Sequence, residues 1–383
     1  RSTFPGSRVE PILAWTTATV GIRLTITPPY KAVVAVAALR FETGKFDREI
    51  GPGTMVSVSS LGEKMVGALR QPERIRDFSH RAAIRFNSRF SDAFVNDDPV
   101  RVMEEDWDNL LILDACRYDT FSEENWLDGS LERRVSIGSS TGEFLYKHFH
   151  DRTHFDTVYV TANPHLQIVP DTFHRVVDLV HDDEYWDPEL QTVPPAAVAA
   201  VTRQVNDEYP NKRLIAHFIQ PHYPFIGPIG RSLDVESALV GHIHKDPDRP
   251  TADGLWAEIA EHDPENFWDK LAREDAATRR TAVDAYRENL RLVLEEVETL
   301  VDDLPGRSVV TSDHGNMLGE RLSPIPVRGY GHPSNTHVPP LVNVPWLAIE
   351  GESRRETVAE TPVGSDDPDP TVVKDRLASL GYI

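Results

Sequence analysis

Two apolar runs of the chain lead into side chains that bind divalent cations. The run LLIL at 110–113 ends in Asp114, and the run SVVT at 308–311 leads through Ser312 into Asp313, His314 and Gly315. Carboxylate and imidazole groups both ligate divalent metals, and glycine lets the backbone turn away from an ion. A single Asp after a strand also starts turns and caps helices. The adjacent Asp-His pair is what favours a metal site.

A stretch of small residues supplies a candidate nucleophile. Residues 136–145 read SIGSSTGEFL, so Thr141 lies where a helix is predicted to begin. A hydroxyl at a helix start faces free N–H groups and the positive end of the helix dipole, which suits a tetrahedral anion. Thr141 would attack a phosphorus or sulfur centre while a metal ion holds its oxygen. The alternative is that the threonine only caps the helix.

Three further residues near these motifs have more than one interpretation. Arg117 could neutralise phosphoryl oxygens, because a guanidinium group matches them bidentately, or it could pair with a nearby carboxylate as framework. Asn163 follows a predicted strand and is a substrate-binding candidate at the same edge. Cys116 is interpreted as a buried packing thiol.

The elements that must position these residues alternate along the chain from about residue 107. Strands are predicted at 155–161, 175–180, 214–220 and 341–349, in addition to the two runs above. A long helix is predicted at 276–304, where apolar residues recur every three or four positions until Pro305-Gly306 ends it. This order predicts an α/β fold, with a mostly parallel central sheet flanked by helices and ligands at the carboxyl ends of its strands.

Composition limits the classes of protein to which such a site could belong. The 383 residues are enough for one large domain, and a single cysteine excludes an internal disulfide framework. No run of about 18 apolar residues occurs, so no integral membrane segment is predicted. The net charge of -21 disfavours nucleic acid and anionic membrane surfaces as partners. This acidity with few lysines resembles the composition of halophilic proteins from salt-loving archaea.

The chain divides into segments of different character. Residues 1–54 hold seven basic and four acidic residues, unlike the acidic remainder, and are interpreted as a non-native or disordered extension. A signal peptide is the competing interpretation, but the apolar run 32–39 is short and Arg40 follows it. Residues 55–106 are expected to form an N-terminal helical segment, and residues 107–383 are expected to form the domain that carries the candidate site. Residues 227–268 form an insertion, either a substrate-recognition wall or a disordered loop. A cytoplasmic location is expected.

The same motifs resemble those of the sulfatase and alkaline phosphatase superfamily. LLILDACRYD at 110–119 resembles its first metal-binding strand, TSDHGNMLGER at 311–321 its second, and GHPSNTHVPPLVNVPWL at 331–347 its following histidine segment. RLASLGYI at 376–383 resembles the C-terminal tail of many sulfatase-like proteins. The resemblance covers roughly residues 108–383. It implies Asp114, Asp313 and His314 as metal ligands, and Thr141 as a nucleophile that bridges to the metal.

Three histidines are also implicated by this resemblance. His222, in QPHYPF, resembles a superfamily segment whose imidazole approaches the substrate ester, although it could be a structural turn histidine. His332 lies about where two-metal members have a further ligand, with His337 as its rival. If the site holds one metal, His332 would contact the substrate instead.

One departure from the superfamily pattern bears on the chemistry. The usual sulfatases carry Cys or Ser in C/S-x-P-x-R, which is converted to formylglycine, and 136–145 contain no such motif. An unmodified Thr or Ser is what phosphatase-like, phosphodiesterase-like and phosphoethanolamine or glycerophosphate transferase-like members use. The resemblance therefore implies a hydrolase or transferase acting through a phospho-threonine, with His222 or His332 protonating the leaving alcohol.

The substrate and the metal stay open at this level. The substrate would be a small-molecule, glycan-linked or lipid-linked phosphate or sulfate ester. A divalent ion is expected, with Mn or Zn favoured by the imidazole and Mg or Ca also compatible with the carboxylates. The alternatives are a sulfatase with an unconventional nucleophile and a noncatalytic sulfatase-like binding protein.

Overall fold

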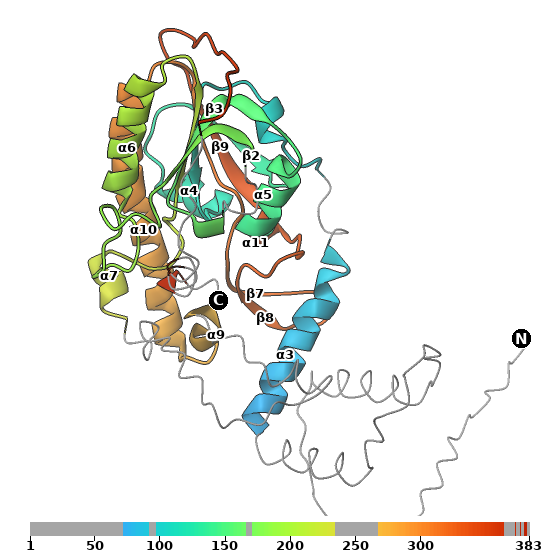
Figure 1. The fold of residues 1–383 in the computed structure, drawn as a ribbon. Coiled ribbons are helices and arrows are strands. Elements are labelled where there is room, and N and C mark those ends of the chain that lie inside the picture. The colour runs from blue at the N-terminus through green and yellow to red at the C-terminus, as the bar shows by residue number, and fades with distance from the viewer. Residues whose placement is uncertain are drawn as a thin grey trace, which may run out of the picture. The chain divides into compact units, whose positions relative to one another are not determined.

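The computed structural model describes residues 72–91, 97–165, 171–233 and 267–363, together with 372, 376, 379 and 380 (Figure 1). The predicted extension at 1–54 lies outside the described residues. So do residues 234–266, which make up most of the predicted insertion, and most of the C-terminal motif at 376–383.

A seven-stranded sheet forms the centre of the fold, with strand order β2-β9-β6-β1-β5-β3-β4. Strands β6, β1, β5, β3 and β4 run parallel, whereas β9 is antiparallel to both β6 and β2. The predicted fold class, a mostly parallel sheet flanked by helices, is confirmed. The strands are β1 (Asn109–Leu113), β2 (Ser130–Val135), β3 (His154–Thr161), β4 (Phe173–Asp178), β5 (Arg213–Phe218), β6 (Ser308–Thr311) and β9 (Asn343–Ile349).

Helices flank this sheet, and a hairpin of β7 (Met317–Arg321) and β8 (Arg328–Gly331) follows β6. No helix in the described ranges is both long enough and apolar enough to span a membrane. The helices are α3 (Pro72–Ser88), η2 (Val102–Glu104), α4 (Tyr118–Glu124), α5 (Thr141–Phe149), α6 (Pro195–Glu208), α7 (Pro228–Arg231), α9 (Phe267–Leu271), α10 (Ala276–Asp303) and α11 (Pro339–Val342).

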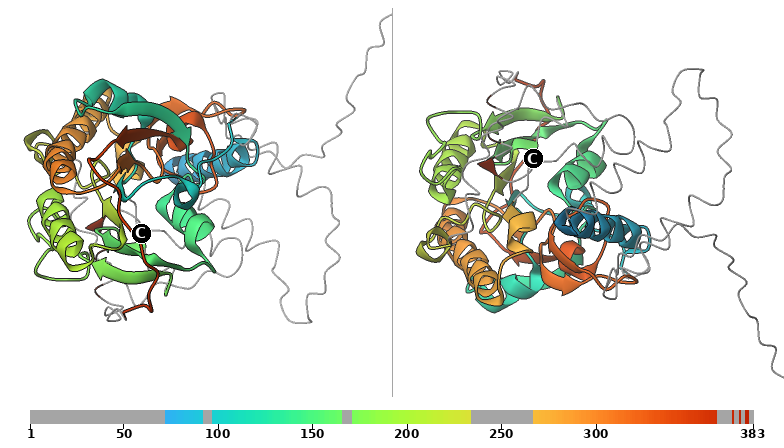
Figure 2. Two further views of the ribbon diagram at one scale, coloured as in Figure 1. Left: turned by 90° about the horizontal axis from the view of Figure 1, so that it is seen from above. Right: turned by 90° about the horizontal axis from the view of Figure 1, so that it is seen from below.

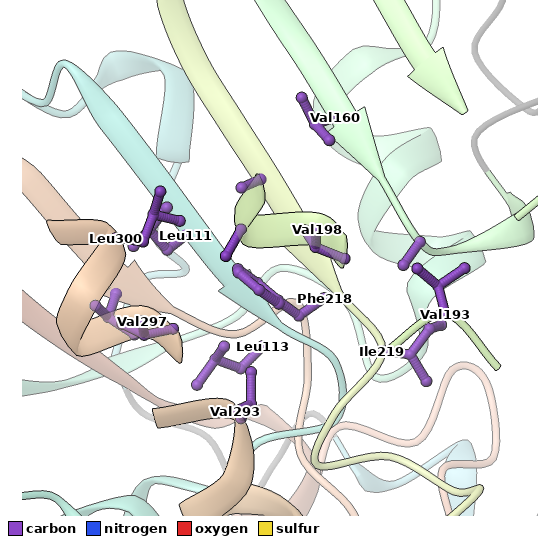
Figure 3. Packing of buried hydrophobic residues seen from close by; sticks show 14 of the residues in the cluster. Leu111, Leu113, Val160, Val193, Val198, Phe218, Ile219, Val293, Val297 and Leu300 are labelled. Carbon is purple, nitrogen blue, oxygen red and sulfur yellow. The ribbon is translucent and has the colours of Figure 1, made fainter. Parts of the chain in front are cut away.

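Strand β1 shows why its sequence is an unbroken apolar run. Its side chains alternate between two hydrophobic cores, as the period of two in a strand requires. Leu111 and Leu113 pack with α6 and α10 on one face (Figure 3), and Leu110 and Ile112 pack with α5 on the other. Views from above and below show α6 and α10 together on one side of the strands and α5 on the other (Figure 2).

The register of the parallel strands brings the predicted ligands to one edge. In β1, Ile112 is opposite Thr311 of β6 and Leu113 is opposite Phe218 of β5. Because parallel strands end at the same edge, the residues that follow β1, β5 and β6 emerge side by side. The site predicted from the two motifs is therefore assembled by strand pairing.

The long helix was predicted closely, and the last strand less so. Helix α10 begins after Asp275, whose carboxylate accepts hydrogen bonds from the N–H groups of Ala277 and Thr278, and it ends before Pro305. The segment predicted as a strand at 341–349 instead starts with α11, because Pro339 pre-organises a helical turn. The strand itself begins at Asn343.

His148 in α5 is expected to make the protein sensitive to acid. It is buried between aromatic rings, its Nε2 makes no hydrogen bond, and burial with nearby Arg152 and Arg101 lowers its pKa to about 3. Unfolding restores a pKa of about 6.5, so the unfolded chain binds more protons and stability falls as the pH drops below that value. Between pH 7 and pH 5 the free energy of unfolding should therefore fall by about 2 kcal/mol less in His148→Phe than in the wild type.

The measurement is urea unfolding of wild-type and variant protein at both pH values. Other histidines contribute equally to both proteins, so the difference between them isolates His148. Equal acid sensitivity of the two proteins would contradict the prediction.

Candidate active site

Three fully buried residues at the carboxyl edge of the sheet form a possible metal-binding cluster. Asp114 follows β1, Asp313 follows β6, and His217 lies in β5, where it is opposite Ile112 of β1 and Thr161 of β3. One ligand atom from each lies within 4.8 Å of the others. Mixed carboxylate and imidazole donors suit Mn and Zn.

His314 adds a fourth side chain to this cluster. Its Nε2 lies 3.4 Å from Asp313 Oδ2 and 3.5 Å from Asp114 Oδ1. Its Nδ1 lies 2.7 Å from the carbonyl oxygen of Gly315, to which a ring N–H donates. In the neutral ring this hydrogen bond leaves the Nε2 lone pair facing the two carboxylates, which is the orientation of a metal ligand.

The hydrogen bonding of the cluster fits a divalent cation. Asp313 Oδ2 and His217 Nε2 are buried and accept or donate no hydrogen bond within the described part of the chain, and they lie 3.9 Å apart. Burying such groups without partners is costly, and a cation between them would offset that cost. Burial lowers the pKa of His217 to about 4, so the ring is neutral at pH 7, as a ligand must be.

The charge state of Asp313 agrees with this assignment. Burial alone would raise its pKa, but the imidazoles of His314 and His217 hold the pKa below its usual value. Its other oxygen, Oδ1, accepts hydrogen bonds from the N–H groups of Ala115 and His314 at 3.1 and 2.9 Å. The carboxylate is therefore ionised and held in one orientation.

Thr141 is the first residue of α5 and points toward this cluster. Its Oγ1 lies 3.2 Å from His314 Nε2, and the residue is 1% exposed. Ser140, and not Thr141, occupies the N-cap position, and its side chain makes no capping hydrogen bond. The Ser140 hydroxyl instead pairs with Ser334, so Thr141 is the hydroxyl of this turn whose contact with the cluster is observed.

Glu143 holds the start of α5 in place. Its carboxylate accepts hydrogen bonds from the N–H and hydroxyl groups of Ser139, both at 2.9 Å, which ties the residue before the N-cap to the first turn of the helix. The Nε2 of His337 lies 2.7 Å from the same carboxylate. His337, a candidate for substrate binding, thus contacts Glu143, and its role toward substrate stays a prediction.

His222 and His332 form a pair of imidazoles beside the cluster. Their Nε2 atoms are 2.9 Å apart, and the ring centroids of His332 and His314 are 4.6 Å apart. Burial lowers the pKa of His222 to about 3 and the pKa of His332 well below its usual value. Both rings are neutral at pH 7, so one Nε2–H donates to the other and could be exchanged for a substrate oxygen.

Asn289 of α10 positions the loop that carries His222. Its Nδ2 donates to the carbonyl oxygens of His222 and Pro224 at 3.1 and 2.9 Å, and its Oδ1 accepts from the N–H of Ile226 at 2.8 Å. The amide is fully buried and uses three hydrogen bonds to fix this loop.

Asn163 contacts a predicted ligand directly. Its Nδ2 donates to Asp114 Oδ2 at 2.6 Å, and its Oδ1 lies near both the N–H and the ring of His165. The amide therefore orients the carboxylate of Asp114, a role different from the predicted substrate contact, which stays a prediction.

Arg117 is engaged with carboxylates of the framework. Its guanidinium donates to both oxygens of Asp119, to Glu320 and to the carbonyl oxygen of Asn316. Burial would lower its pKa, but Asp119 and Glu320 raise it. Of the two interpretations of Arg117, the pairing with Asp119 is the one observed, and catalytic use would require it to exchange these partners.

His217 is the residue of the cluster that sequence reasoning missed. It lies inside the apolar run LIAHFIQ, where a lone histidine resembles a core residue, and only the pairing of β5 with β1 brings it to Asp313. The Tyr159 hydroxyl lies 2.9 Å from its Nδ1 and orients the ring. The signal available was a polar residue near the end of a buried strand.

No family model and no curated protein matches the chain. Several solved structures are similar in fold to part of the chain. The integral membrane protein lipooligosaccharide phosphoethanolamine transferase A from Neisseria meningitidis is 13% identical, with a TM-score of 0.40 over 64% of this chain and 47% of that one. The chain therefore spans about half of that transferase.

A 2-O GAG sulfatase is 13% identical, with a TM-score of 0.39 over 67% of this chain and 65% of that one. A phosphonate monoester hydrolase from Silicibacter pomeroyi is 18% identical, with a TM-score of 0.34 over 70% and 72%. These are enzymes of the sulfatase and alkaline phosphatase superfamily. It is the superfamily that the sequence motifs resemble. Because the TM-scores are below 0.5, we base the function on the geometry of the site.

Proposed function

We propose that this protein is a metal-dependent enzyme that transfers phosphoryl-type groups from phosphate esters or phosphodiesters through Thr141. The observation that carries the proposal is the position of the Thr141 hydroxyl, in the first turn of α5 and 3.2 Å from His314 at the edge of a buried carboxylate and imidazole cluster. A nucleophile, an anion-binding helix start and a set of metal-type donors then meet at one point.

Each residue of the site has a distinct task in this proposal. Asp114, Asp313, His314 and His217 would hold the ion. A divalent cation there would lower the pKa of the threonine hydroxyl and stabilise the charge that develops on the phosphoryl oxygens. The N–H groups at the start of α5 would face those same oxygens.

The reaction proceeds in two steps. Thr141 Oγ1 forms a bond to phosphorus, and the bond from phosphorus to the alcohol oxygen breaks. The threonine hydroxyl releases its proton to solvent, and the alcohol oxygen takes up a proton through the His222 and His332 pair, which regains one from the attacking water or alcohol in the second step. Water or a second alcohol then attacks the phospho-threonine and frees the hydroxyl.

Turnover of matched chromogenic esters tests the proposal. Wild-type protein, stripped of metal and then loaded with Mn or Zn, is assayed at low and high salt on p-nitrophenyl phosphate, a p-nitrophenyl phosphodiester and p-nitrophenyl sulfate. We expect metal-dependent turnover of a phosphorus ester. Turnover of the sulfate alone would support a sulfatase. Inactivity on all three without metal binding would support a noncatalytic protein.

A further inference from the structure

Two buried polar side chains beside the imidazole pair make no hydrogen bonds. Asn316 is fully buried, and within the described residues neither its Nδ2 nor its Oδ1 has a hydrogen-bond partner. Trp268 is 4% exposed, and its indole Nε1–H finds no acceptor in that part of the chain. Buried polar groups are normally satisfied, so two such side chains in one region indicate that something outside the protein completes them.

The hairpin register places Asn316 next to His332. Met317 pairs with Gly331 and Leu318 pairs with Tyr330, so the residues one step outside this ladder are Asn316 and His332. Asn316 and His332 are therefore neighbouring positions at the end of the hairpin, and His332 is the residue that contacts His222.

Trp268 borders the same place from the opposite side. A Cβ added to Gly331 would lie 2.9 Å from carbons of its indole ring, so the ring rests against the backbone next to His332. Its ring centroid is 6.4 Å from that of His222, and it packs in one cluster with Leu318 and Tyr330. The two orphan side chains thus flank the His222 and His332 pair.

Comparable residues elsewhere in the fold are fully satisfied. Asn289 is equally buried and makes three hydrogen bonds, and the Trp107 indole N–H donates to the carbonyl oxygen of Val102 at 2.6 Å. Asn316 and Trp268 therefore differ from these two buried residues of the same types, whose side-chain polar groups are paired.

We propose that Asn316 and Trp268 form a neutral subsite for a hydroxyl-bearing alcohol arm of the ester, of glycerol or sugar type. This inference rests on the proposed function. The subsite offers donors at Asn316 Nδ2 and Trp268 Nε1 and an acceptor at Asn316 Oδ1. A hydroxyl both donates and accepts, so neighbouring hydroxyls satisfy all three atoms. An ammonium would leave the donors unpaired, and a carboxylate would leave the acceptor unpaired.

Thermal unfolding of the free protein separates this role from a structural one. Asn316→Leu removes groups that bond to nothing, so the melting temperature should stay the same or rise, whereas the matched control Asn289→Leu should lower it by about 5 °C or more. Likewise, Trp268→Phe should lower the melting temperature less than Trp107→Phe does, because only the Trp107 substitution breaks a hydrogen bond. If Asn316→Leu lowers the melting temperature as much as Asn289→Leu does, the subsite proposal is overturned.

Turnover of two p-nitrophenyl phosphodiesters tests the substrate class. One has a glyceryl arm and the other a propyl arm, so they share the leaving group and differ in hydroxyls. Wild-type kcat/KM should favour the glyceryl ester by about 10²-fold, and Asn316→Leu and Trp268→Phe should each reduce this preference by about 10-fold. Their kcat/KM on the propyl ester should fall less than their kcat/KM on the glyceryl ester, because the subsite makes no polar contact with the propyl arm.

The outcomes keep the two proposals apart. Equal turnover of the two esters by the wild type, or an unchanged preference in both variants, overturns the subsite and leaves the phosphoryl-transfer proposal standing. Inactivity on both esters, with metal bound, overturns both proposals.

Discussion

Replacing Thr141 by alanine is expected to lower kcat on phosphorus esters by at least about 10³-fold, because the variant lacks the hydroxyl that we propose as the nucleophile. The fold should survive, since Thr141 lies at the first position of α5 and its side-chain hydrogen bonds are made with the cluster residues His314 and Asp313. The measurement is single-turnover kinetics with the metal-loaded enzyme, together with mass spectrometry for a phosphorylated peptide that is present in wild type and absent in the variant.

Ser140→Ala is the matched control for that experiment. Its hydroxyl is one residue away but pairs with Ser334, so its loss should change kcat by no more than a few fold. Turnover that survives Thr141→Ala and disappears in Ser140→Ala or Ser139→Ala would show that a neighbouring serine is the nucleophile.

The second large effect is expected for Asp313→Asn, which should abolish tight metal binding. The substitution keeps the side chain's shape, and its Oδ1 can still accept from the N–H groups of Ala115 and His314. It removes the negative charge of Oδ2, which faces His217 and His314. Wild-type protein should gain about 3 kcal/mol of stability when metal is added at 100 times its Kd, and the variant should gain almost none.

The readouts for this substitution are metal content after dialysis and the shift in melting temperature on adding Mn or Zn. Asp108→Asn is the control, because Asp108 is also buried but lies before the amino end of β1, where it binds Arg307 and Arg354. That variant should lose stability and keep the metal-induced shift. If the melting temperature of Asp313→Asn rises on adding metal as much as that of the wild type, the cluster is not a metal site.

Local sequence patterns were sufficient to predict several strands, the long helix and part of the site. The apolar run at 110–113 is a strand buried on both faces, and the apolar spacing at 276–304 is the helix α10 with its Asp275 cap. Both signals depend only on neighbouring residues, so the sequence shows them directly. Strand β2 was not predicted, because its charged and mostly exposed residues belong to an edge strand, where packing does not select an apolar run.

By itself the sequence determined the strands of the parallel part of the sheet, the long helix α10 and the metal-type side chains that follow two of the strands. Only the tertiary structure decided that His217 faces Asp313, that Asn163 orients Asp114, and that Arg117 is held by Asp119 and Glu320. The physical reason is that parallel pairing joins strands far apart in the chain, and its register, which no local pattern encodes, sets which polar atoms meet.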